Sequence, residues 1–142
     1  MFIGKKVVHK GKVYNQYFAT EEGFVYSLQE KGGKVTLNKI GTKGSNGNDG
    51  KKRKYPTVNI GGKTIDTHSI IAETFFGDPT NVRPRSITES EWKRTPASVK
   101  QLIRNNAIHV DHINGDITDN RVSNLQYMLA NDNIKKGGVA RR

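Results

Sequence analysis

The stretch of this 142-residue chain that most strongly indicates its fold is residues 108–136, which read IHVDHINGDITDNRVSNLQYMLANDNIKK. Residues 108–112 have the β-branched and polar composition of a strand, and Asn114-Gly115-Asp116 is a turn signal that ends it. A polar loop follows, and residues 125–129 return as a second strand. The last residues favour a short helix. The predicted order is therefore strand, loop, strand, helix.

Three polar groups in this stretch resemble a known family. They are DHINGD at 111–116, DNRVSNL at 119–125 and NDN at 131–133. The pattern is similar to the core of the HNH homing endonucleases of phages and introns, within the ββα-metal nuclease superfamily. Residues 18–28 and 68–75 also resemble the sheet and helix that often precede this core in phage members. The resemblance implies a metal-dependent endonuclease acting on duplex DNA.

The same resemblance implies a role for four residues. His112 would be the general base, and Asp111 beside it would be a metal ligand. Asn124 stands where the family has the residue that orients the histidine, and Asn133 would be the second metal ligand. Many members have histidine at this last position. An asparagine there makes a zinc-type site less suitable.

The chemistry of these residue types agrees with that assignment. Neighbouring residues of a strand point to opposite faces, so Asp111 and His112 can approach one ion only where the strand ends or distorts. Two oxygen donors leave most of an octahedral shell to water and phosphate, which suits Mg²⁺, with Mn²⁺ as an alternative. An ordinary imidazole titrates near about pH 6.5, so a histidine can accept a proton from water near neutral pH.

The chain is strongly basic, with 24 Lys and Arg against 13 Asp and Glu and a formal net charge of +11. The first half, residues 1–71, carries 13 of the basic and 5 of the acidic side chains. Such a charge attracts polyanions, of which nucleic acid is the usual one. Charge alone leaves three other interpretations open: simple solubility, a catalytically inactive DNA- or RNA-binding module, and a ribosome-associated structural protein.

The fold class predicted for the whole chain is α+β. Residues 12–18 and 23–28 are rich in β-branched and aromatic side chains, and residues 35–40 and 55–60 alternate apolar and polar, which favours four strands in an antiparallel meander. Residues 67–77 predict a helix over one face of this sheet, with Thr67 as a possible N-cap and Gly77 as its end. Short helices are expected near 86–92 and 96–104. We expect residues 1–104 to recognise DNA and residues 105–142 to form the nuclease module.

Residues 41–54 (GTKGSNGNDGKKRK) lack apolar side chains, so we expect a mobile loop. It is either a DNA-contacting loop or a solvated hairpin connection, and the sequence favours neither. Together with strand residues that could enter the major groove and with the basic tail, it supplies the expected DNA contacts. These are Lys51, Lys52, Arg53, Lys54, Thr57, Asn59, Lys63, Arg121, Lys135 and Lys136.

Several polar and aromatic residues receive a plainer interpretation. His109 is expected to be a partly exposed strand residue, with a metal or phosphate contact as the alternative. His68 is expected to mark the start of a helix, and the tyrosines, including Tyr55, to lie in the core or on a sheet face. Asp116 and Asp119 are expected to cap turns, and Asn120 and Arg121 to brace the loop.

The expected setting is cytoplasmic, in a bacterial host if the chain is phage-encoded. No apolar run approaches membrane-spanning length, the first residues do not have the order of a secretory signal, and the chain has no cysteine. We expect a monomer or a weak homodimer. The sequence does not indicate the target site, or whether one strand or both are cut.

Overall fold

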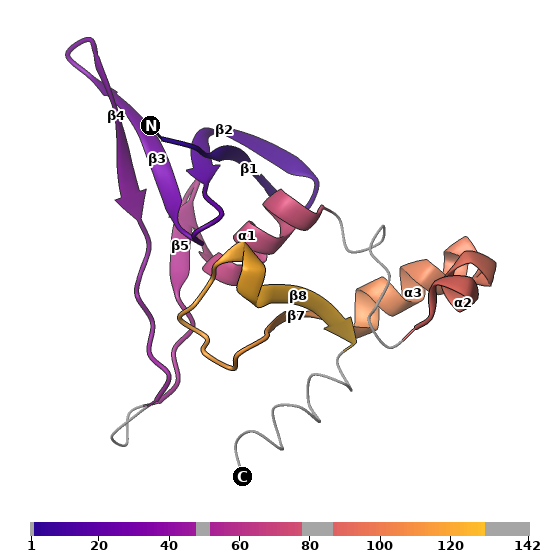
Figure 1. The fold of residues 1–142 in the computed structure, drawn as a ribbon. Coiled ribbons are helices and arrows are strands. Elements are labelled where there is room, and N and C mark those ends of the chain that lie inside the picture. Colours follow the sequence, from indigo (N-terminus) through magenta and orange to yellow (C-terminus); the bar gives the residue numbers. More distant parts are fainter. Residues whose placement is uncertain (1, 48–51, 78–86, 130–142) are drawn as a thin grey trace.

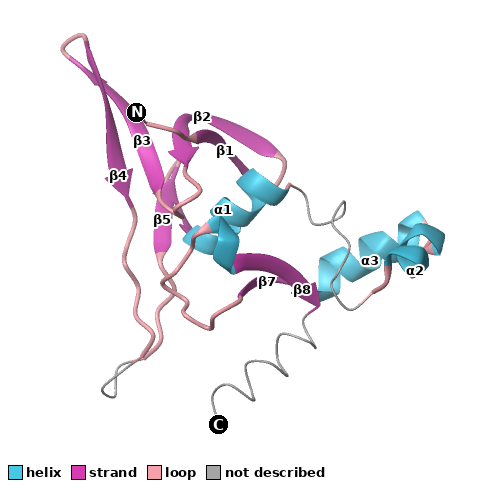
Figure 2. Ribbon diagram, viewed as in Figure 1, coloured by secondary structure: helices cyan, strands magenta, loops and turns pink. Residues whose placement is uncertain are grey.

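The computed structural model describes residues 2–47, 52–77 and 87–129. Strands and helices are mixed along the chain, and the strands pair antiparallel, which confirms the predicted α+β class (Figures 1 and 2). None of the helices in these ranges is long and apolar enough to cross a membrane. The helix expected after residue 129 lies outside the described residues.

A four-stranded meander forms the first sheet (Figure 1). Its strands, in spatial and chain order, are β1 (Lys5–His9), β2 (Lys12–Ala19), β3 (Val25–Lys31) and β4 (Lys34–Ile40). The predicted four-stranded meander is present, but one of its strands differs from the prediction. The strand β1 was not predicted, and residues 57–60 do not join this sheet.

Those residues form β5 (Thr57–Ile60), which among the described strands pairs only with β6 (Lys63–Asp66) as a two-stranded hairpin. Gly61 and Gly62 make its turn with φ of 59° and 85°, a conformation that favours glycine. Because β6 follows after a two-residue turn, β5 forms its backbone hydrogen bonds with this neighbouring segment of the chain. The strand was predicted correctly and its partner was not.

Helix α1 (Thr67–Phe76) begins directly after β6 and packs against β1. Its N-cap is Asp66 rather than the expected Thr67, whose buried hydroxyl has no hydrogen-bond partner among the described residues. Gly77 ends the helix with a φ of 87°, as expected. Ile70, Ile71 and Ala72 are fully buried, so this helix supplies the centre of the core.

The second half of the chain starts with two helices that project from the main body, α2 (Glu89–Arg94) and α3 (Ala97–Ala107) (Figure 1). Helix α3 leads directly into β7 (Ile108–His112), which pairs antiparallel with β8 (Leu125–Leu129). A short 3-10 turn, η2 (Val122–Asn124), precedes β8. The predicted boundary at residues 104 and 105 therefore falls inside α3.

One hydrophobic core joins the two halves. It lies where β1, β2 and β3 meet the β5–β6 hairpin and α1, and β8 contributes to it. Its buried members are Val7, Ala19, Val25, Val58, Ile60, Ile70, Ile71 and Leu125. Burial of these side chains is what holds the strand-loop-strand segment against α1.

The β4–β5 connection, residues 41–56, is more ordered at its base than the sequence suggests. Backbone bonds join Ser45 to Lys54 in both directions, at 2.7 and 2.8 Å, and Thr42 to Thr57 at 2.8 Å. The two arms of the connection thus run as an antiparallel ladder toward residues 48–51, which lie outside the described part of the chain. The expectation of a wholly mobile loop is wrong for these two arms.

Candidate active site

Asp111 and His112 occupy the last two positions of β7. Both side chains are buried, with exposed fractions of 5% and 6%. The strand stops here because Ile113 to Gly115 turn the chain: the backbone N–H of Gly115 donates to the carbonyl of His112 at 2.9 Å, and Gly115 has a φ of 79°. This is the strand end that both residues need if they are to serve one site.

His112 is held by an amide. Its Nε2 lies 2.7 Å from Oδ1 of Asn120, which is itself buried. An amide oxygen only accepts hydrogen bonds, so this contact places the proton of a neutral imidazole on Nε2. The basic lone pair is then on Nδ1, which fixes the tautomer of the candidate base.

The expectation that the Asn124 side chain orients the imidazole of His112 is wrong. Its side chain does not bond the imidazole: among the described residues it accepts from the backbone N–H of Asn114 at 3.0 Å and donates to Asn114 Oδ1 and the Asp119 carbonyl at 3.0 and 2.9 Å. Asn124 therefore braces the backbone of the turn, and Asn120 orients the histidine. Asn120 was expected only to brace the loop.

We call residues 113–124 the site loop, and its own side chains hold it together. Asp116 accepts from the backbone N–H and the hydroxyl of Thr118 at 2.9 and 2.6 Å. Arg121 donates to both oxygens of Asp119, at 2.9 and 2.7 Å. The hydrogen bonds from Arg121 lower the pKa of Asp119 to about 2, and those from Thr118 and Asn46 lower the pKa of Asp116. These carboxylates cap turns as expected.

Two other parts of the chain hold the site loop from outside. The amide of Asn46, on the β4–β5 connection, donates to Asp116 Oδ1 at 2.7 Å and accepts from the backbone N–H of Ile117 at 3.0 Å. The turn between β2 and β3 provides the second contact, since the carbonyl of Glu21 accepts from the N–H of Val122 at 2.8 Å. In the same turn, a Cβ on Gly23 would lie 2.3 Å from the backbone carbonyl of Asn120.

Two aromatic side chains complete the surroundings of His112. The ring of His68 lies 5.3 Å from that of His112 between centroids, and the ring of Tyr55 lies 6.2 Å away. Neither residue was expected in the site, and Tyr55 was expected in the core or on a sheet face. Tyr55 is instead 41% exposed beside the histidines. No spacing signal connects them to His112, because 44 and 57 residues separate them from it in the sequence.

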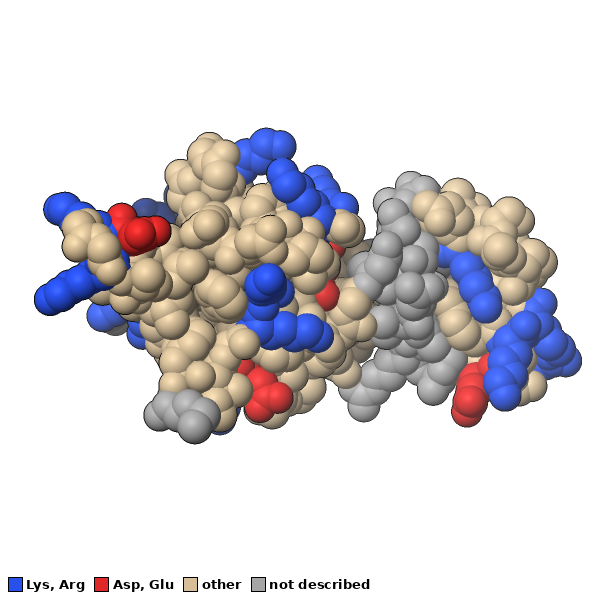
Figure 3. All heavy atoms as spheres, turned by 90° about the horizontal axis from the view of Figure 1, so that it is seen from above, with Lys and Arg blue, Asp and Glu red and all other residues tan. Residues whose placement is uncertain are grey.

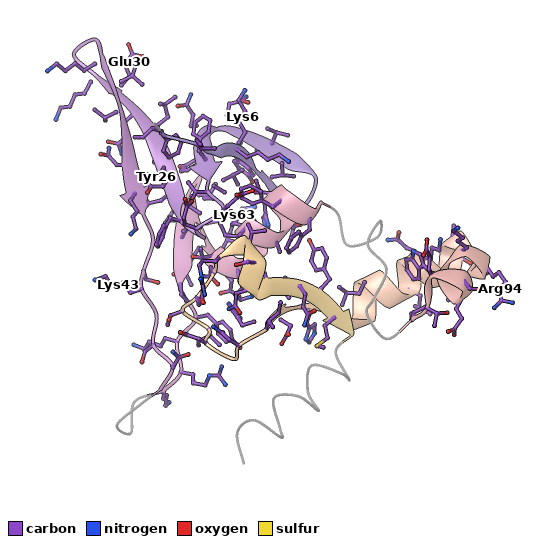
Figure 4. The ribbon with its side chains drawn as sticks, in the orientation of Figure 1. Lys6, Tyr26, Glu30, Lys43, Lys63 and Arg94 are labelled. Atoms are coloured by element: carbon purple, nitrogen blue, oxygen red, sulfur yellow. The ribbon has the colours of Figure 1, made fainter. Side chains whose placement is uncertain are left out.

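The predicted DNA-contacting residues lie on different elements. Lys52, Arg53 and Lys54 are on the returning arm of the β4–β5 connection, and Lys63 is at the β5–β6 turn (Figure 4). Thr57 and Asn59 are on β5, and Arg121 is on the site loop with its charge paired to Asp119. Seen from above, Lys and Arg side chains are spread over the visible face and not gathered in one patch (Figure 3). Asn133, Lys51, Lys135 and Lys136 lie outside the described residues.

Asp111 has the properties of a ligand for a hard cation. One of its oxygens, Oδ2, accepts from the amide of Gln126 on the paired strand at 2.8 Å, a contact that holds the carboxylate without neutralising it. No cluster of three or more His, Asp or Glu side chains suited to a metal occurs within the described ranges. A carboxylate oriented by a neutral amide is a suitable ligand for a divalent cation that prefers oxygen donors.

His109 lies two residues before Asp111 on β7 and its side chain is exposed. It lines a cavity of about 440 Å³ together with His9, His68 and Glu73. His9 is bound to Glu73 there, with 2.5 Å between Nδ1 and Oε2.

Comparison with known proteins gives one curated relative and one solved structure to set beside this geometry. No protein-family model matches the chain. An uncharacterized HNH endonuclease of Acanthamoeba polyphaga mimivirus, L247, is 32% identical over 89 residues, which is 58% of this chain and 22% of the relative. The HNH homing endonuclease I-HmuI, studied for DNA binding and cleavage, matches with a TM-score of 0.51 and 21% identity. The match covers 99% of this chain and 60% of that one.

These likenesses support an HNH nuclease assignment. The structural match shows that the α+β arrangement is that of an HNH homing endonuclease. The chain spans about a fifth of the mimivirus relative and 60% of the solved HNH protein. The curated HNH relative and the HNH fold thus agree with the resemblance that residues 111–133 indicate.

Proposed function

We propose that this chain is a metal-dependent endonuclease that hydrolyses phosphodiester bonds in duplex DNA, with His112 as its general base. The observation that carries the proposal is the pairing of a buried histidine with a buried carboxylate at one strand end, with the histidine tautomer set by Asn120. A fixed neutral imidazole is suited to take a proton from water. The HNH relatives support the same reaction class.

The proposed metal is Mg²⁺, with Mn²⁺ as the alternative, held by Asp111 and Asn133. When bound, such an ion would stabilise the negative charge that develops on the phosphate and on the departing 3′ oxygen. Asp111 is suited to this because Gln126 holds its carboxylate by a neutral amide. Oxygen donors favour Mg²⁺ over zinc.

The remaining residues hold His112 and its strand in position or bind DNA. Asn120 keeps the proton of the imidazole on Nε2, so that Nδ1 receives the proton of the attacking water. Asn124 keeps the backbone at residue 114 in place, and with it the end of β7. Lys52, Arg53 and Lys54 would bind the DNA backbone ahead of the site.

Incubation of supercoiled plasmid with the purified protein tests this function directly. We expect open-circular or linear product with Mg²⁺ and none with EDTA. His112→Ala should lower the cleavage rate by about 10²- to 10⁴-fold while leaving the Kd for duplex DNA nearly unchanged. His109→Ala is the matched control, because it removes an exposed histidine from the same strand. Cleavage by His112→Ala at the wild-type rate would contradict the assignment.

The second candidate is a basic DNA- or RNA-binding module without catalysis, which the net charge of +11 favours. Metal dependence separates the two functions. Binding alone should persist in EDTA, and no product should form at any Mg²⁺ concentration. An RNA preference, with no effect of His112 or Asn133 substitution on any activity, would favour a ribosome-associated role.

We propose that the chain acts as a phage homing-type nuclease. It would work in the bacterial cytoplasm, as a monomer or a weak dimer. One chain with one site cuts one strand at a time, so two visits or two copies are needed for a double-strand break. The order in which open-circular and linear plasmid appear distinguishes nicking from paired cutting.

A further inference from the structure

A second histidine, partly buried, packs against the candidate base. His68 is the second residue of α1, and its side chain is 13% exposed. Its ring lies 5.3 Å from that of His112 with 77° between the ring planes, an edge-on contact. On its other side, the ring of Tyr55 lies 5.2 Å away at 59°. His68 thus stands between an outer tyrosine and the histidine of the site.

Hydrogen bonding does not explain this placement of His68. Its Nδ1 is buried and has no hydrogen-bond partner in the described part of the chain. Its Nε2 lies 3.9 Å from Oδ2 of Asp66, which is beyond hydrogen-bond distance. The ring is therefore held by packing between Tyr55 and His112.

Charge does not explain the placement either. Burial, and then the neighbouring His112, lower the pKa of His68 to about 4, against the opposing influence of Asp66. The ring is neutral at neutral pH, so it adds no positive charge beside the candidate base. What it offers His112 is a flat, rigid surface.

Such a surface restrains the plane of the His112 ring. The bond from Nε2 to Asn120 fixes one atom of that ring. The terminal torsion of a histidine has a broad energy minimum, so packing against the ring helps to select its plane. An aromatic ring set edge-on at 77° restricts this motion.

We propose that His68 is a positioning residue for His112, whose ring it holds in the plane in which Nδ1 can reach the attacking water. The proposal rests on the proposed function for its effect on cleavage. The effect on the imidazole itself does not depend on that function. A positioning error at a reacting group can lower a rate by about 100-fold without a change in binding.

The first test measures the ring and needs no activity. In histidine-labelled protein, ¹³C relaxation of the ring C–H groups gives the order parameter of the His112 ring, whose signals His112→Ala assigns. We expect a high order parameter in the wild type, a lower one in His68→Ala, and the wild-type value in His68→Phe, which keeps a ring at this position. His68→Leu replaces the alanine variant if that variant does not fold. An unchanged order parameter of the His112 ring in the variant without a ring at position 68 would overturn the proposal.

The control for this test is His9→Ala. His9 lines the same cavity with a similar exposed side-chain fraction of 15%, but its partner is Glu73. Its loss should lower the melting temperature and leave the order parameter of the His112 ring unchanged. If His9→Ala lowers this order parameter as much as His68→Ala does, the effect is general loosening and the proposal is wrong.

The second test is single-turnover cleavage of duplex DNA. We expect His68→Ala to lower the rate about 10- to 100-fold with the Kd for DNA within about twofold of the wild type. His68→Phe should restore most of the rate. A folded His68→Ala protein that cleaves at the wild-type rate overturns the proposal. If the wild type does not cleave, a lower order parameter of the His112 ring in His68→Ala still supports the positioning role, and the proposed function alone fails.

Discussion

Two polar segments of this chain, the site loop and the β4–β5 connection, are stabilised in different ways. In the site loop, carboxylates and amides bond to nearby backbone and to one another, as between Asn124, Asn114 and Asp119. The described arms of the β4–β5 connection are joined mainly by backbone bonds, such as those between Ser45 and Lys54. The two segments meet where Asn46 bonds to Asp116 and Ile117.

The difference indicates that the site loop holds His112 in position, whereas the β4–β5 connection attracts the negatively charged DNA. Side-chain bonds within a short loop fix the backbone that presents His112, which a catalytic site requires. Basic side chains on a backbone ladder provide positive charge over a length of chain, which binding to a phosphate backbone requires. Perturbation of the first segment should therefore lower the cleavage rate, and perturbation of the second should weaken DNA binding.

The largest effect is expected at Gly23, which lies against the site loop. Gly23→Ala places a Cβ 2.3 Å from the backbone of Asn120, at a φ of 92° that L residues rarely adopt. The loop must shift, and Asn120 with it, so we expect cleavage to fall by about 100-fold or more and stability by about 2 kcal/mol or more. Plasmid cleavage and thermal denaturation measure the two losses.

Gly33→Ala is the matched control for this substitution. Gly33 has a φ of 80° in the β3–β4 turn, but a Cβ there meets no atom within 4 Å. Its cost should be the backbone strain alone, about 1 to 2 kcal/mol, with cleavage by the folded protein unchanged. Equal losses of cleavage in both variants would show that contact with Asn120 is not what matters.

The next effect distinguishes two amides of the site loop. Asn120→Ala removes the partner of His112, so we expect a cleavage rate lower by about 10- to 100-fold with little change in melting temperature. Asn124→Ala removes three bonds that close the turn, so it should lower stability by about 1 to 3 kcal/mol. If Asn124→Ala shifts the ¹⁵N resonances of His112 more than Asn120→Ala does, then Asn124 and not Asn120 orients the imidazole.

A smaller effect is expected on the β4–β5 connection. Lys52→Gln combined with Arg53→Gln should weaken duplex binding about tenfold at moderate salt and reduce the slope of log K against log salt by about 2. The cleavage rate of bound DNA should not change. The measurement is a salt titration of the Kd by fluorescence anisotropy, with Lys31→Gln on the far hairpin as control. An unchanged salt slope would remove this connection from the interface.

The smallest effect near neutral pH belongs to the carboxylates of the site loop. Because the folded pKa of Asp119 is lowered to about 2, its contribution to stability is present above the unfolded pKa of about 3.9 and is lost as pH falls toward 2. Asp119→Asn should therefore lower the melting temperature at pH 6 by a few degrees and have less effect at pH 2.5. Equal effects at both pH values would contradict the Arg121 pairing as the cause.

The strands β2 and β3 were predicted from β-branched and aromatic composition, β4 from alternation, and the helix α1 from its spacing and end signals, because these signals depend on local residues. The missed strands β1 and β6 are short and carry charged residues, in KKVVH and KTID, and are stabilised by their partners. The pairing of β5 with β6 could not be read from β5 alone. Strand identity is a local property and strand partnership is not.

The same limit applies to the candidate site. The positions of Asp111 and His112 at a strand end follow from the Asn114-Gly115 turn signal. The partner of His112 was predicted wrongly, because several Asn and Asp side chains lie within reach in the site loop and the backbone dihedrals decide which one bonds. His68 and Tyr55 join the site only through folding of α1 and the β4–β5 connection against β7, which no spacing rule describes.

The contact between Glu21 and Val122, with Leu125 packed among residues of the first sheet, has a consequence for protein engineering. A chimera that grafts residues 105–142 onto a foreign DNA-binding scaffold would leave Leu125 exposed to solvent and the turn around Asn120 without its abutting glycine. A transplant that also carries α1 and the hairpin between β2 and β3 keeps those supports. Retargeting of the proposed nuclease is therefore better attempted by exchanging basic side chains on the two arms of the β4–β5 connection than by swapping modules.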